Sequence, residues 1–342
     1  MTIPVKCKPG DTLRVIAPSK SLSNLSQDTI DMATERLSSL GLKVSFSQYA
    51  YEHQFLGCAS IKQRVDDCHQ AFLDPNVSII LTAMGGYQVN QLLEHLDYDL
   101  IAQHPKILCG FSDITALQNA IYAQTGLVVY SGMHFSSFAS DLGIDYSVAC
   151  FKQAVMHNQP FKLKPSRMVH DENDPTLSQI KPHQLHTHLY NHYDTTSPSD
   201  YWVIQAGHTS GIIVGGNLGT SLLLHGTDYC PDYTDKIVMI EAVSSTEGKS
   251  DVYRFERNLQ ALIHQPSFKQ ARALMIGRFE PKFGMTRELL THICMQKPAL
   301  ASMPVIANMD FGHTMPMATI PIGGYGHIQA SHHGEATITV EG

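Results

Sequence analysis

The alternation of short apolar runs with helix-periodic segments over residues 1–130 is the feature that most constrains the fold. Runs rich in Val, Ile and Leu, such as Val77–Ala83, predict buried strands, and segments such as Gln27–Leu40, with apolar residues three or four positions apart, predict amphipathic helices. The other expected strands are Thr12–Ala17, Leu42–Phe46, Lys106–Gly110 and Leu127–Tyr130. Repeated β–α units of this kind predict an α/β fold with a mainly parallel, doubly wound sheet.

Residue types at the ends of the helical segments support this prediction. Gly41 follows the first helix, where a glycine is common just past the last turn. Ser60 and Gln63 have the spacing of a capping box at the start of a helix that ends near Leu73. Further helices are expected through Leu92–Leu93 and over Asp113–Gln124.

Composition divides the chain into three parts. From about residue 140 to residue 205 Lys, Pro, His, Asn and Asp dominate, which predicts a linker with a long loop bordering the site. Apolar runs then return, and 342 residues are enough for two domains. The predicted parts are an N-terminal α/β domain at 1–165, a linker and substrate loop at 166–205, and a C-terminal β/α domain at 206–342. In the last part strands are expected at Gly211–Val214, Lys236–Glu241, Ala273–Ile276, Pro304–Ala307 and Ala336–Val340, and helices at Asp251–His264 and Thr286–Gln296.

Charge and cysteine content narrow the partners and the compartment. The formal net charge is −7, and the 24 Lys and Arg residues are scattered, which argues against nucleic acid or an anionic membrane as a partner. No signal peptide and no membrane-spanning apolar run is visible. Seven cysteines without a C-x-x-C pair predict free thiols in the reducing cytoplasm.

Ser112 is the strongest candidate for chemistry. It stands between the predicted strand Lys106–Gly110 and the predicted helix that Asp113 opens. A serine at such a corner is exposed and lies beside N–H groups of the helix start that have no intrahelical acceptor. This predicts a nucleophile with part of an oxyanion hole built from the N–H groups of the helix start. The alternative is that Ser112 only caps the helix.

A glycine pair could complete that oxyanion hole. Gly85 and Gly86 follow the strand Val77–Ala83, and the carboxyl ends of parallel strands meet at one edge of the sheet, where Ser112 also lies. Their N–H groups could therefore cradle a phosphate or face an oxyanion, although glycine pairs often only make turns. Tyr87, the next residue, is a candidate substrate contact.

Ser112 needs a base, and His313 and Glu241 have suitable contexts. His313 follows the strand Pro304–Ala307 in a glycine-containing turn, and Glu241 ends an apolar strand. A carboxylate there can receive the imidazole N–H, fix the tautomer and stabilise the imidazolium. Spacing alone does not prove a triad, since Glu241 could pair with a nearby cation and His313 could be a turn residue.

Two further motifs have alternative interpretations. Gly215-Gly216-Asn217-Leu218 predicts a tight turn, or else a loop in which Asn217 contacts the substrate. Trp202, the only tryptophan, could anchor the end of the loop in the core or stack on a ligand.

The histidine-rich segment His183–His192 resembles a metal cluster, with histidines at 183, 186, 188 and 192. Metal sites usually add a carboxylate or thiolate in fixed geometry, and the sequence shows none there. We therefore expect no metal.

At these residues the chain resembles the LD-carboxypeptidase family, peptidase family S66, over nearly its whole length. The matching motifs are Val15–Ser19, Gly110–Thr115, Gly215–Leu218, Ile240-Glu241, Ile276–Phe279, Asp310–His313 and Pro321–Gly324. The resemblance implies Ser112 as nucleophile, Glu241 as triad acid and His313 as base. It also implies an oxyanion hole from Asp113 N–H and a glycine of the Gly85-Gly86 pair.

The family fold implied is a flavodoxin-like α/β domain that bears the serine, followed by a swivelling β/α domain that bears the glutamate and histidine. The site would then lie between the domains, without a metal or organic cofactor, and is often completed by a homodimer.

Within the family, the chain is similar to the microcin C self-immunity-like branch. Asn90–Leu93, Asp97–Ile101 and His134–Phe138 are the residues that favour this branch. Met84 stands where the muropeptide enzymes tend to have Arg, and Met133 where the family usually has Pro. An Arg at position 84 could pair with a carboxylate, so the murein tetrapeptide is the less favoured substrate.

The function that these residues and the resemblance imply is that of a cytoplasmic serine peptidase or amidase. It would hydrolyse the amide bond of small peptidyl or aminoacyl compounds, with aminoacyl nucleotides of the microcin type first. The alternatives are a muropeptide LD-carboxypeptidase that releases a terminal D-amino acid, and a non-catalytic two-domain protein that closes on a small ligand.

Overall fold

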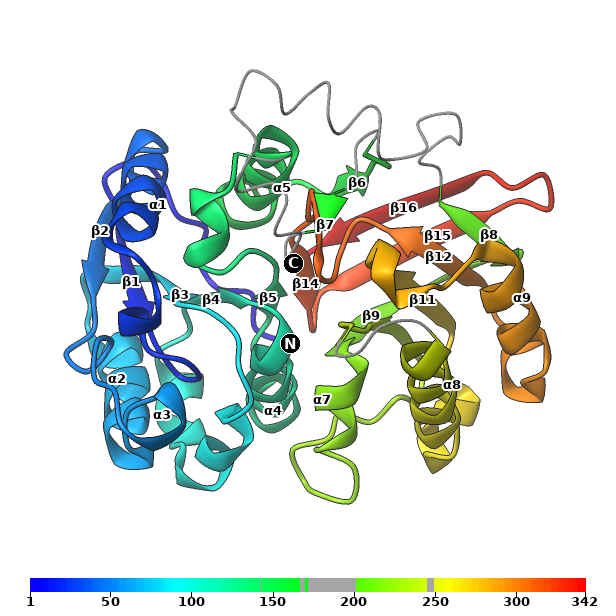
Figure 1. Cartoon of the computed structure of the whole chain (residues 1–342), viewed down its shortest axis with the longest axis horizontal. Coiled ribbons are helices and arrows are strands. Elements are labelled where there is room, and N and C mark those ends of the chain that lie inside the picture. Colours follow the sequence, from blue (N-terminus) through cyan, green and yellow to red (C-terminus); the bar gives the residue numbers. More distant parts are fainter. Residues whose placement is uncertain (142, 167–169, 172–200, 245–248) are drawn as a thin grey trace.

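The computed structural model describes residues 1–141, 143–166, 170–171, 201–244 and 249–342. It consists of two α/β domains that lie side by side, each built on one large sheet (Figure 1). Within the described residues, no helix combines the length and the apolar character needed to span a membrane. The segment His183–His192 and most of the predicted loop at 166–205 lie outside the described residues.

The first sheet has the strand order β14-β5-β4-β3-β1-β2. Its members are β1 (Thr12–Ile16), β2 (Lys43–Phe46), β3 (Val77–Thr82), β4 (Ile107–Gly110), β5 (Val129–Ser131) and β14 (Ile320–Ile322). Strands β1 to β5 are parallel, and their order 2-1-3-4-5 is that of flavodoxin-like sheets, which confirms the predicted doubly wound fold. The order reverses between β1 and β3, and ligands bind outside the carboxyl ends of strands at such a point.

Helices cover both faces of this sheet (Figure 1). Helices α1 (Gln27–Ser39) and α5 (Ile144–Met156) pack on one face, and α2 (Ile61–Leu73), α3 (Tyr98–Gln103) and α4 (Thr115–Thr125) on the other. The capping box of Ser60 and Gln63 starts α2 as predicted.

The structure differs from the expected helices in two places. The helix expected through Leu92–Leu93 is a 3-10 helix, Val89–His95. Helix α5 forms in a stretch where the polar composition predicts a linker, because Phe151, Ala154 and Val155 recur at helical spacing and pack in the core.

The second sheet has the strand order β6-β16-β15-β9-β10-β11-β12-β8. Its members are β6 (Phe161–Leu163), β8 (Trp202–Gln205), β9 (Gly207–Asn217), β10 (Lys236–Glu241), β11 (Ala273–Gly277), β12 (Val305–Met309), β15 (Tyr325–Ala330) and β16 (Ala336–Glu341). Strands β9 to β12 are parallel, and the outer strands join them antiparallel. Helices α7 (Leu218–Leu222), α8 (Lys249–Ile263) and α9 (Arg287–Met295) contribute to a hydrophobic core on this sheet.

Each sheet contains a strand from the part of the chain that forms the other domain. Strand β6, which ends before residue 165, pairs with β16 in the second sheet, and β14 extends the first sheet beside β5. A short strand pair, β7 (His170–Asp171) with β13 (Thr314–Met315), adds a contact close to His313. The polypeptide therefore crosses between the domains several times.

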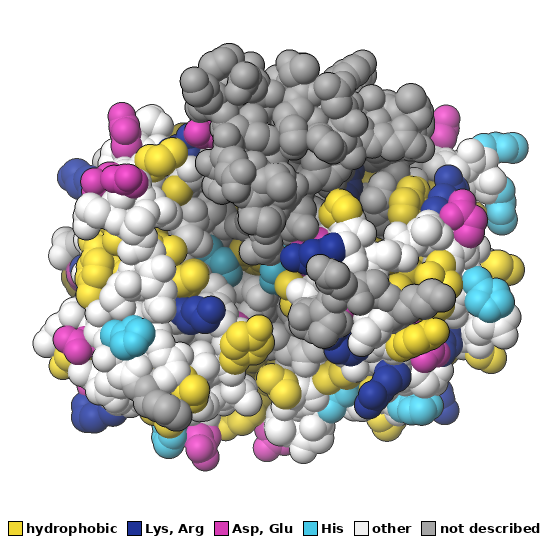
Figure 2. All heavy atoms as spheres, in the orientation of Figure 1, with side chains coloured by type: hydrophobic (Ala, Val, Ile, Leu, Met, Phe, Trp, Pro, Cys, Tyr) yellow, Lys and Arg dark blue, Asp and Glu magenta, His cyan; other side chains and the backbone are white. Residues whose placement is uncertain are grey.

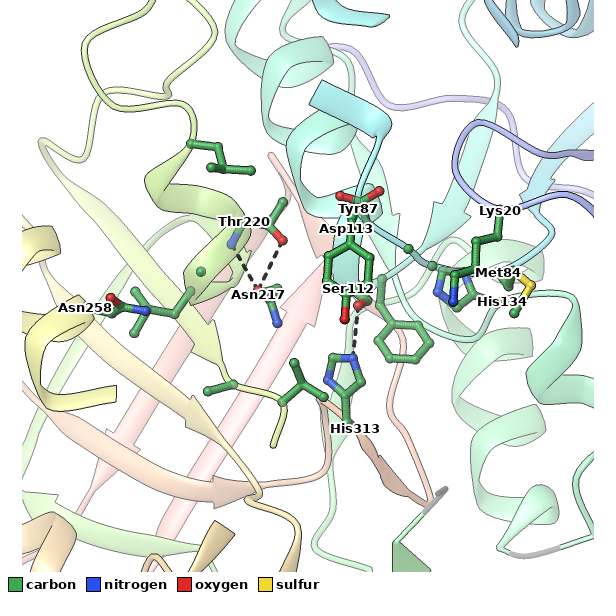
Figure 3. A pocket seen from close by; sticks show the side chains of 18 of the residues that line it. Lys20, Met84, Tyr87, Ser112, Asp113, His134, Asn217, Thr220, Asn258 and His313 are labelled. Carbon is green, nitrogen blue, oxygen red and sulfur yellow. Dashed lines mark hydrogen bonds between the residues drawn. The ribbon is translucent and has the colours of Figure 1, made fainter. Parts of the chain in front are cut away.

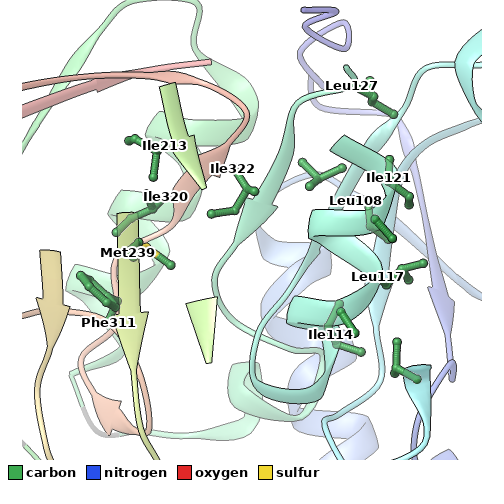
Figure 4. Packing of buried hydrophobic residues seen from close by; sticks show 14 of the residues in the cluster. Leu108, Ile114, Leu117, Ile121, Leu127, Ile213, Met239, Phe311, Ile320 and Ile322 are labelled. Carbon is green, nitrogen blue, oxygen red and sulfur yellow. The ribbon is translucent and has the colours of Figure 1, made fainter. Parts of the chain in front are cut away.

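Helix α4 joins the two domains. One hydrophobic cluster includes Leu117 of α4 as well as Ile213 and Met239 of the second sheet (Figure 4). The side chain of Asn119 exchanges two hydrogen bonds of 2.9 Å with the backbone of Gly215. The site between the domains is consequently built on a packed interface.

The Gly215-Gly216 pair lies within strand β9 instead of in the predicted turn. A Cβ on Gly216, whose φ is +140°, would lie 2.5 Å from Oγ1 of Thr115 on α4. The glycines are thus needed for close approach of the helix to the strand, a role that glycine can have in a strand interior.

Candidate active site

Ser112 occupies the corner between β4 and α4, as predicted. Its φ is +61°, in the left-handed region that non-glycine residues rarely adopt, and a short 3-10 turn, Ser112–Ile114, leads into the helix. This strained corner turns the hydroxyl out of the backbone and toward the cavity (Figure 3). The geometry is that of a nucleophile elbow.

A continuous chain of hydrogen bonds links Ser112, His313 and Glu241. Nδ1 of His313 lies 2.8 Å from Oε2 of Glu241, and its Nε2 lies 3.0 Å from Oγ of Ser112 (Figure 3). Because a carboxylate only accepts hydrogen bonds, Nδ1 bears the proton. In the neutral ring Nε2 then accepts from the serine hydroxyl. The structure therefore brings the three predicted residues together in the arrangement of a Ser-His-carboxylate triad.

Glu241 is held on both oxygens. It is the last residue of β10, is 3% exposed, and accepts a 2.9 Å hydrogen bond on Oε1 from Nδ2 of Asn217. Asn217, in turn, caps α7 by accepting from the backbone N–H of Thr220 at 3.0 Å. Asn217 lines the pocket, where the sequence predicts a substrate contact, and it also positions the carboxylate.

A buried ion pair supports the turn that bears His313. Arg278 lies 2.9 Å from Asp310, and both side chains are almost fully buried. The carboxylate of Asp310 also accepts the backbone N–H of Ser166 at 2.9 Å. Burial raises the pKa of Asp310 to about 6 despite the arginine. The pair ties the residues just before His313 to the second sheet.

The Asp113 carboxylate fastens the glycine turn to the elbow. It is 3% exposed and accepts hydrogen bonds from Oγ of Ser19 at 2.7 Å and from the backbone N–H groups of Gln88 and Val89 at 2.9 and 3.0 Å. Burial raises the pKa of this carboxyl, and the three hydrogen bonds oppose that shift. The side chain thereby holds the loop that contains Gly85.

Gly85 lies directly beside the serine. A Cβ added to Gly85 would be 3.2 Å from Cβ and 3.3 Å from Oγ of Ser112, and one added to Gly86 would be 2.3 Å from Oγ of Ser19. The backbone of this turn is close enough to face an oxygen that develops next to Ser112. The N–H of Asp113, in the first turn of its helix, is a second suitable donor.

His134 is a second imidazole near the serine, and sequence reasoning did not assign it a role. The single hydroxyl proton of Thr82 is donated to the carbonyl of Cys109 at 3.2 Å, so Nδ1 of His134, 2.8 Å away, donates to Oγ1 of Thr82. Nε2 then has no proton. Burial, with a smaller effect of His313, lowers the pKa of His134 to about 3, so the ring is neutral at physiological pH.

The triad opens into a cavity of about 560 Å³ between the domains. Figure 2 shows a hollow in the middle of this face, with Lys and Arg side chains near it and most acidic side chains at the outer edge. Besides the residues already described, its lining includes Lys20, Met84, Tyr87, Thr220, Arg254 and Asn258. In Figure 3, Lys20, Met84 and His134 lie on one side of Ser112, and Asn217, Thr220 and Asn258 on the other.

Of the two remaining residues predicted to contact the substrate, Tyr87 lines the cavity and Trp202 does not. Tyr87 lines the cavity and is 79% exposed, which suits a substrate contact. Trp202 belongs to β8, packs against the core of the second domain and is absent from the lining of the cavity. The position of Trp202 matches the core interpretation, and its alternative role in stacking on a ligand stays a prediction. The parts of the chain that the structure describes contain no group of His, Cys, Asp or Glu able to hold a metal ion.

Comparisons with known proteins agree with this architecture. Two family models match the chain, the LD-carboxypeptidase N-terminal domain over residues 13–132 and the LD-carboxypeptidase C-terminal domain over residues 210–328. A Bacillus subtilis (strain 168) protein named "Putative carboxypeptidase YocD" is 42% identical over 325 residues, 95% of this chain and 95% of that protein.

Solved structures of related proteins have the same two-domain fold. The crystal structure of an MccF-like protein from Bacillus anthracis str. Ames is 41% identical, has a TM-score of 0.90, and the match covers 100% of this chain and 99% of that one. The microcin C7 self-immunity protein MccF in complex with aspartyl sulfamoyl adenosine has a TM-score of 0.82 over 100% and 99% of the two chains. At 24% identity the latter likeness shows the fold alone.

Proposed function

We propose that this chain, which belongs to the LD-carboxypeptidase family (peptidase family S66), is a serine peptidase or amidase. The family consists of carboxypeptidase-type hydrolases. The observation that supports a serine mechanism is the hydrogen-bond chain from Glu241 through His313 to Ser112. Three groups on three separate strand ends meet in the order that nucleophilic catalysis requires.

In the first half of the reaction, Oγ of Ser112 attacks the carbonyl carbon of an amide while Nε2 of His313 takes its proton. Glu241 accepts the Nδ1 proton of His313 in a hydrogen bond and stabilises the imidazolium. The oxyanion is stabilised by the N–H of Asp113 and by an N–H of the glycine turn. The imidazolium then protonates the leaving amine, and an acyl-enzyme on Ser112 remains.

In the second half, water attacks the acyl-enzyme and gives its proton to His313. The same donors stabilise the second oxyanion, and His313 returns the proton to Oγ of Ser112 as the acid leaves. No step in this sequence requires a metal or an organic cofactor. Because the proton returns to Ser112, both Ser112 and His313 end the cycle in the protonation state in which they began it.

For the substrate, we propose small peptidyl or aminoacyl compounds, with aminoacyl nucleotides first. The support is the fold of a relative whose structure contains aspartyl sulfamoyl adenosine, together with Met84 in place of the arginine of muropeptide enzymes. A murein tetrapeptide is the alternative, favoured by the carboxypeptidase names of relatives. We also propose a homodimer and a cytoplasmic location, the latter because all seven cysteines are free thiols.

A product screen tests the proposal. Purified protein, Ser112→Ala and the surface control Ser39→Ala are each incubated with an aminoacyl-sulfamoyl adenosine and with a murein tetrapeptide, and products are identified by mass spectrometry. We expect hydrolysis of at least one compound by wild type and Ser39→Ala, and none by Ser112→Ala. Equal turnover by Ser112→Ala would disprove the serine mechanism. Tight binding without turnover, and no labelling of Ser112 by a serine-reactive probe, would favour a binding protein.

A further inference from the structure

The charges of the cavity are unequally compensated. Among the described residues of the lining, Asp113 is buried and accepts three hydrogen bonds, and Arg254 forms a 2.7 Å ion pair with Asp251. His134 contributes no charge, because its buried ring is neutral. Lys20 has no acidic partner among the residues that the structure describes, so the described lining has an uncompensated positive charge.

Lys20 lies where the fold favours ligand binding. It follows β1 at the point between β1 and β3 where the strand order of the first sheet reverses. Its aliphatic stem packs on the glycine turn, since a Cβ on Gly86 would lie 3.1 Å from Cγ of Lys20. The neighbouring residue, Ser19, is held by Asp113 at 2.7 Å. The ammonium group is thus attached to the same rigid assembly as the predicted oxyanion donors.

The surroundings of Lys20 also suit an anion. In Figure 3 its side chain lies near Met84 and His134, on the side of Ser112 away from Asn217 and Asn258. Among the described residues of the lining no acidic side chain other than Asp113 is present, so a ligand anion would meet little opposing charge. A charge-assisted hydrogen bond to an ammonium group is stronger than a neutral one, and it strengthens where water is excluded.

We propose that Lys20 binds a carboxylate of the substrate and selects amides that have this carboxylate close to the scissile bond. The proposal rests on the proposed hydrolase function and deepens it, because it names the chemistry of the substrate. Lys20 would supply, from the end of β1, a positive charge where Met84 offers only an apolar side chain. The carboxylate could be the free C-terminus of the leaving residue or the side chain of an acidic acyl residue.

Matched substrates distinguish these two sources. One compound has a free C-terminal carboxylate and a neutral acyl residue, a second has a C-terminal amide and an aspartyl acyl residue, and a third is neutral at both positions. Wild type, Lys20→Gln, Lys20→Arg and the exposed control Lys62→Gln are assayed on all three. Lys62 is paired with Asp66 on the helix surface, so Lys62→Gln removes the same charge at a distance from the cavity.

We expect Lys20→Gln to raise KM about 10- to 100-fold for one of the carboxylate compounds, with kcat little changed. Turnover of the neutral compound should change less than about twofold, Lys20→Arg should retain most of the activity, and Lys62→Gln should resemble wild type. Equal effects of Lys20→Gln on charged and neutral compounds, or a wild-type preference for the neutral one, would overturn the proposal.

A binding measurement separates this inference from the proposed function. The three compounds are titrated calorimetrically into Ser112→Ala and into Ser112→Ala/Lys20→Gln, so turnover is not needed. Tighter binding of a carboxylate compound that depends on Lys20 supports the inference even if wild type hydrolyses nothing. Turnover by wild type without any dependence of binding on Lys20 rejects the inference and leaves the hydrolase function intact.

Discussion

The two parts of the cavity are held in different ways. In the catalytic part, Ser112, His313, Glu241 and Asn217 form one chain of hydrogen bonds, and each side chain is fixed by the next. In the recognition part, Tyr87 is 79% exposed, and Lys20 lines the cavity without an acidic partner among the described residues. This difference agrees with the proposed division of roles, in which the hydrogen-bonded network carries out the reaction and the available side chains select the substrate.

Substitution of His313 gives the largest expected effect and tests whether the catalytic part acts independently of the recognition part. We expect His313→Gln to lower kcat by about 10⁴-fold or more with little change in KM, because the base is lost while the recognition part is unchanged. Steady-state kinetics on the substrate found in the product screen measures both constants. A large rise in KM at unchanged kcat would show that His313 belongs to recognition instead.

The next largest effect is expected at Glu241. In Glu241→Gln the side chain keeps its shape, but its amide can donate to Nδ1 of His313 and so favour the wrong tautomer. We expect kcat to fall by about 10³- to 10⁴-fold, with the fold and KM retained. Kinetics together with a thermal unfolding curve checks this. A loss of less than about tenfold would mean that the tautomer of His313 does not depend on the negative charge of Glu241.

Asp113→Asn should have a smaller effect. The amide oxygen can still accept from part of the loop that bears Gly85, but the charge that strengthens the three hydrogen bonds is removed. Misplacement of one oxyanion donor predicts a loss of about 10- to 100-fold in kcat. An unchanged kcat would show that the glycine turn keeps its position without the carboxylate.

His134 lines the cavity on the same side of Ser112 as Lys20, and its neutral state can be tested by pH. Its pKa is lowered to about 3 in the folded protein, so between pH 3 and the ordinary value of 6.5 the unfolded chain binds the extra proton. The contribution of His134 to stability is therefore complete above pH 6.5 and decreases as pH falls, by at most about 1.4 kcal/mol per pH unit.

We expect His134→Gln to show a shallower loss of stability than wild type between pH 6.5 and pH 4. Urea unfolding midpoints across this range measure the difference, and the exposed His157→Gln is the control. Parallel curves for wild type and His134→Gln would mean that the pKa of His134 is the same in the folded and unfolded chains. The described lining would then gain a second positive charge as pH falls below about 6.5.

The sequence predicts the catalytic part of the cavity better than the recognition part. Ser112 and Gly85 follow parallel strands of the first sheet, whose carboxyl ends meet at one edge, so sequence position places these two residues together. Glu241 ends a strand of the second sheet, and its approach to Ser112 depends on the packing of the two domains. Lys20 follows β1 and could have been found by the same rule. His134, in contrast, depends on packing against Thr82 and Phe111 that no local pattern shows.

The parts of the fold that the sequence does not predict are those that depend on non-local pairing. Strand β14 has only three residues, and its place beside β5 is set by the path of the chain between the domains. A glycine pair such as Gly215-Gly216 is typical both of a turn and of a strand that a helix approaches closely, so the sequence does not distinguish the two structures. At helix α5 the polar composition predicts a linker, although the apolar residues of the segment have helical spacing.

The smallest effect is expected at Tyr87, and it tests the recognition part alone. The ring is exposed at the cavity, and within the described part of the chain its hydroxyl forms no hydrogen bond to the triad network. Removal of the ring should therefore leave kcat unchanged. We expect Tyr87→Ala to raise KM by less than about tenfold, since an exposed aromatic contact contributes about 0.5–1.5 kcal/mol. Tyr87→Phe should retain most of the affinity if the ring provides the contact. A fall in kcat with Tyr87→Ala would instead mean that this side chain holds the glycine turn, and the separation of the cavity into two parts would fail at this residue.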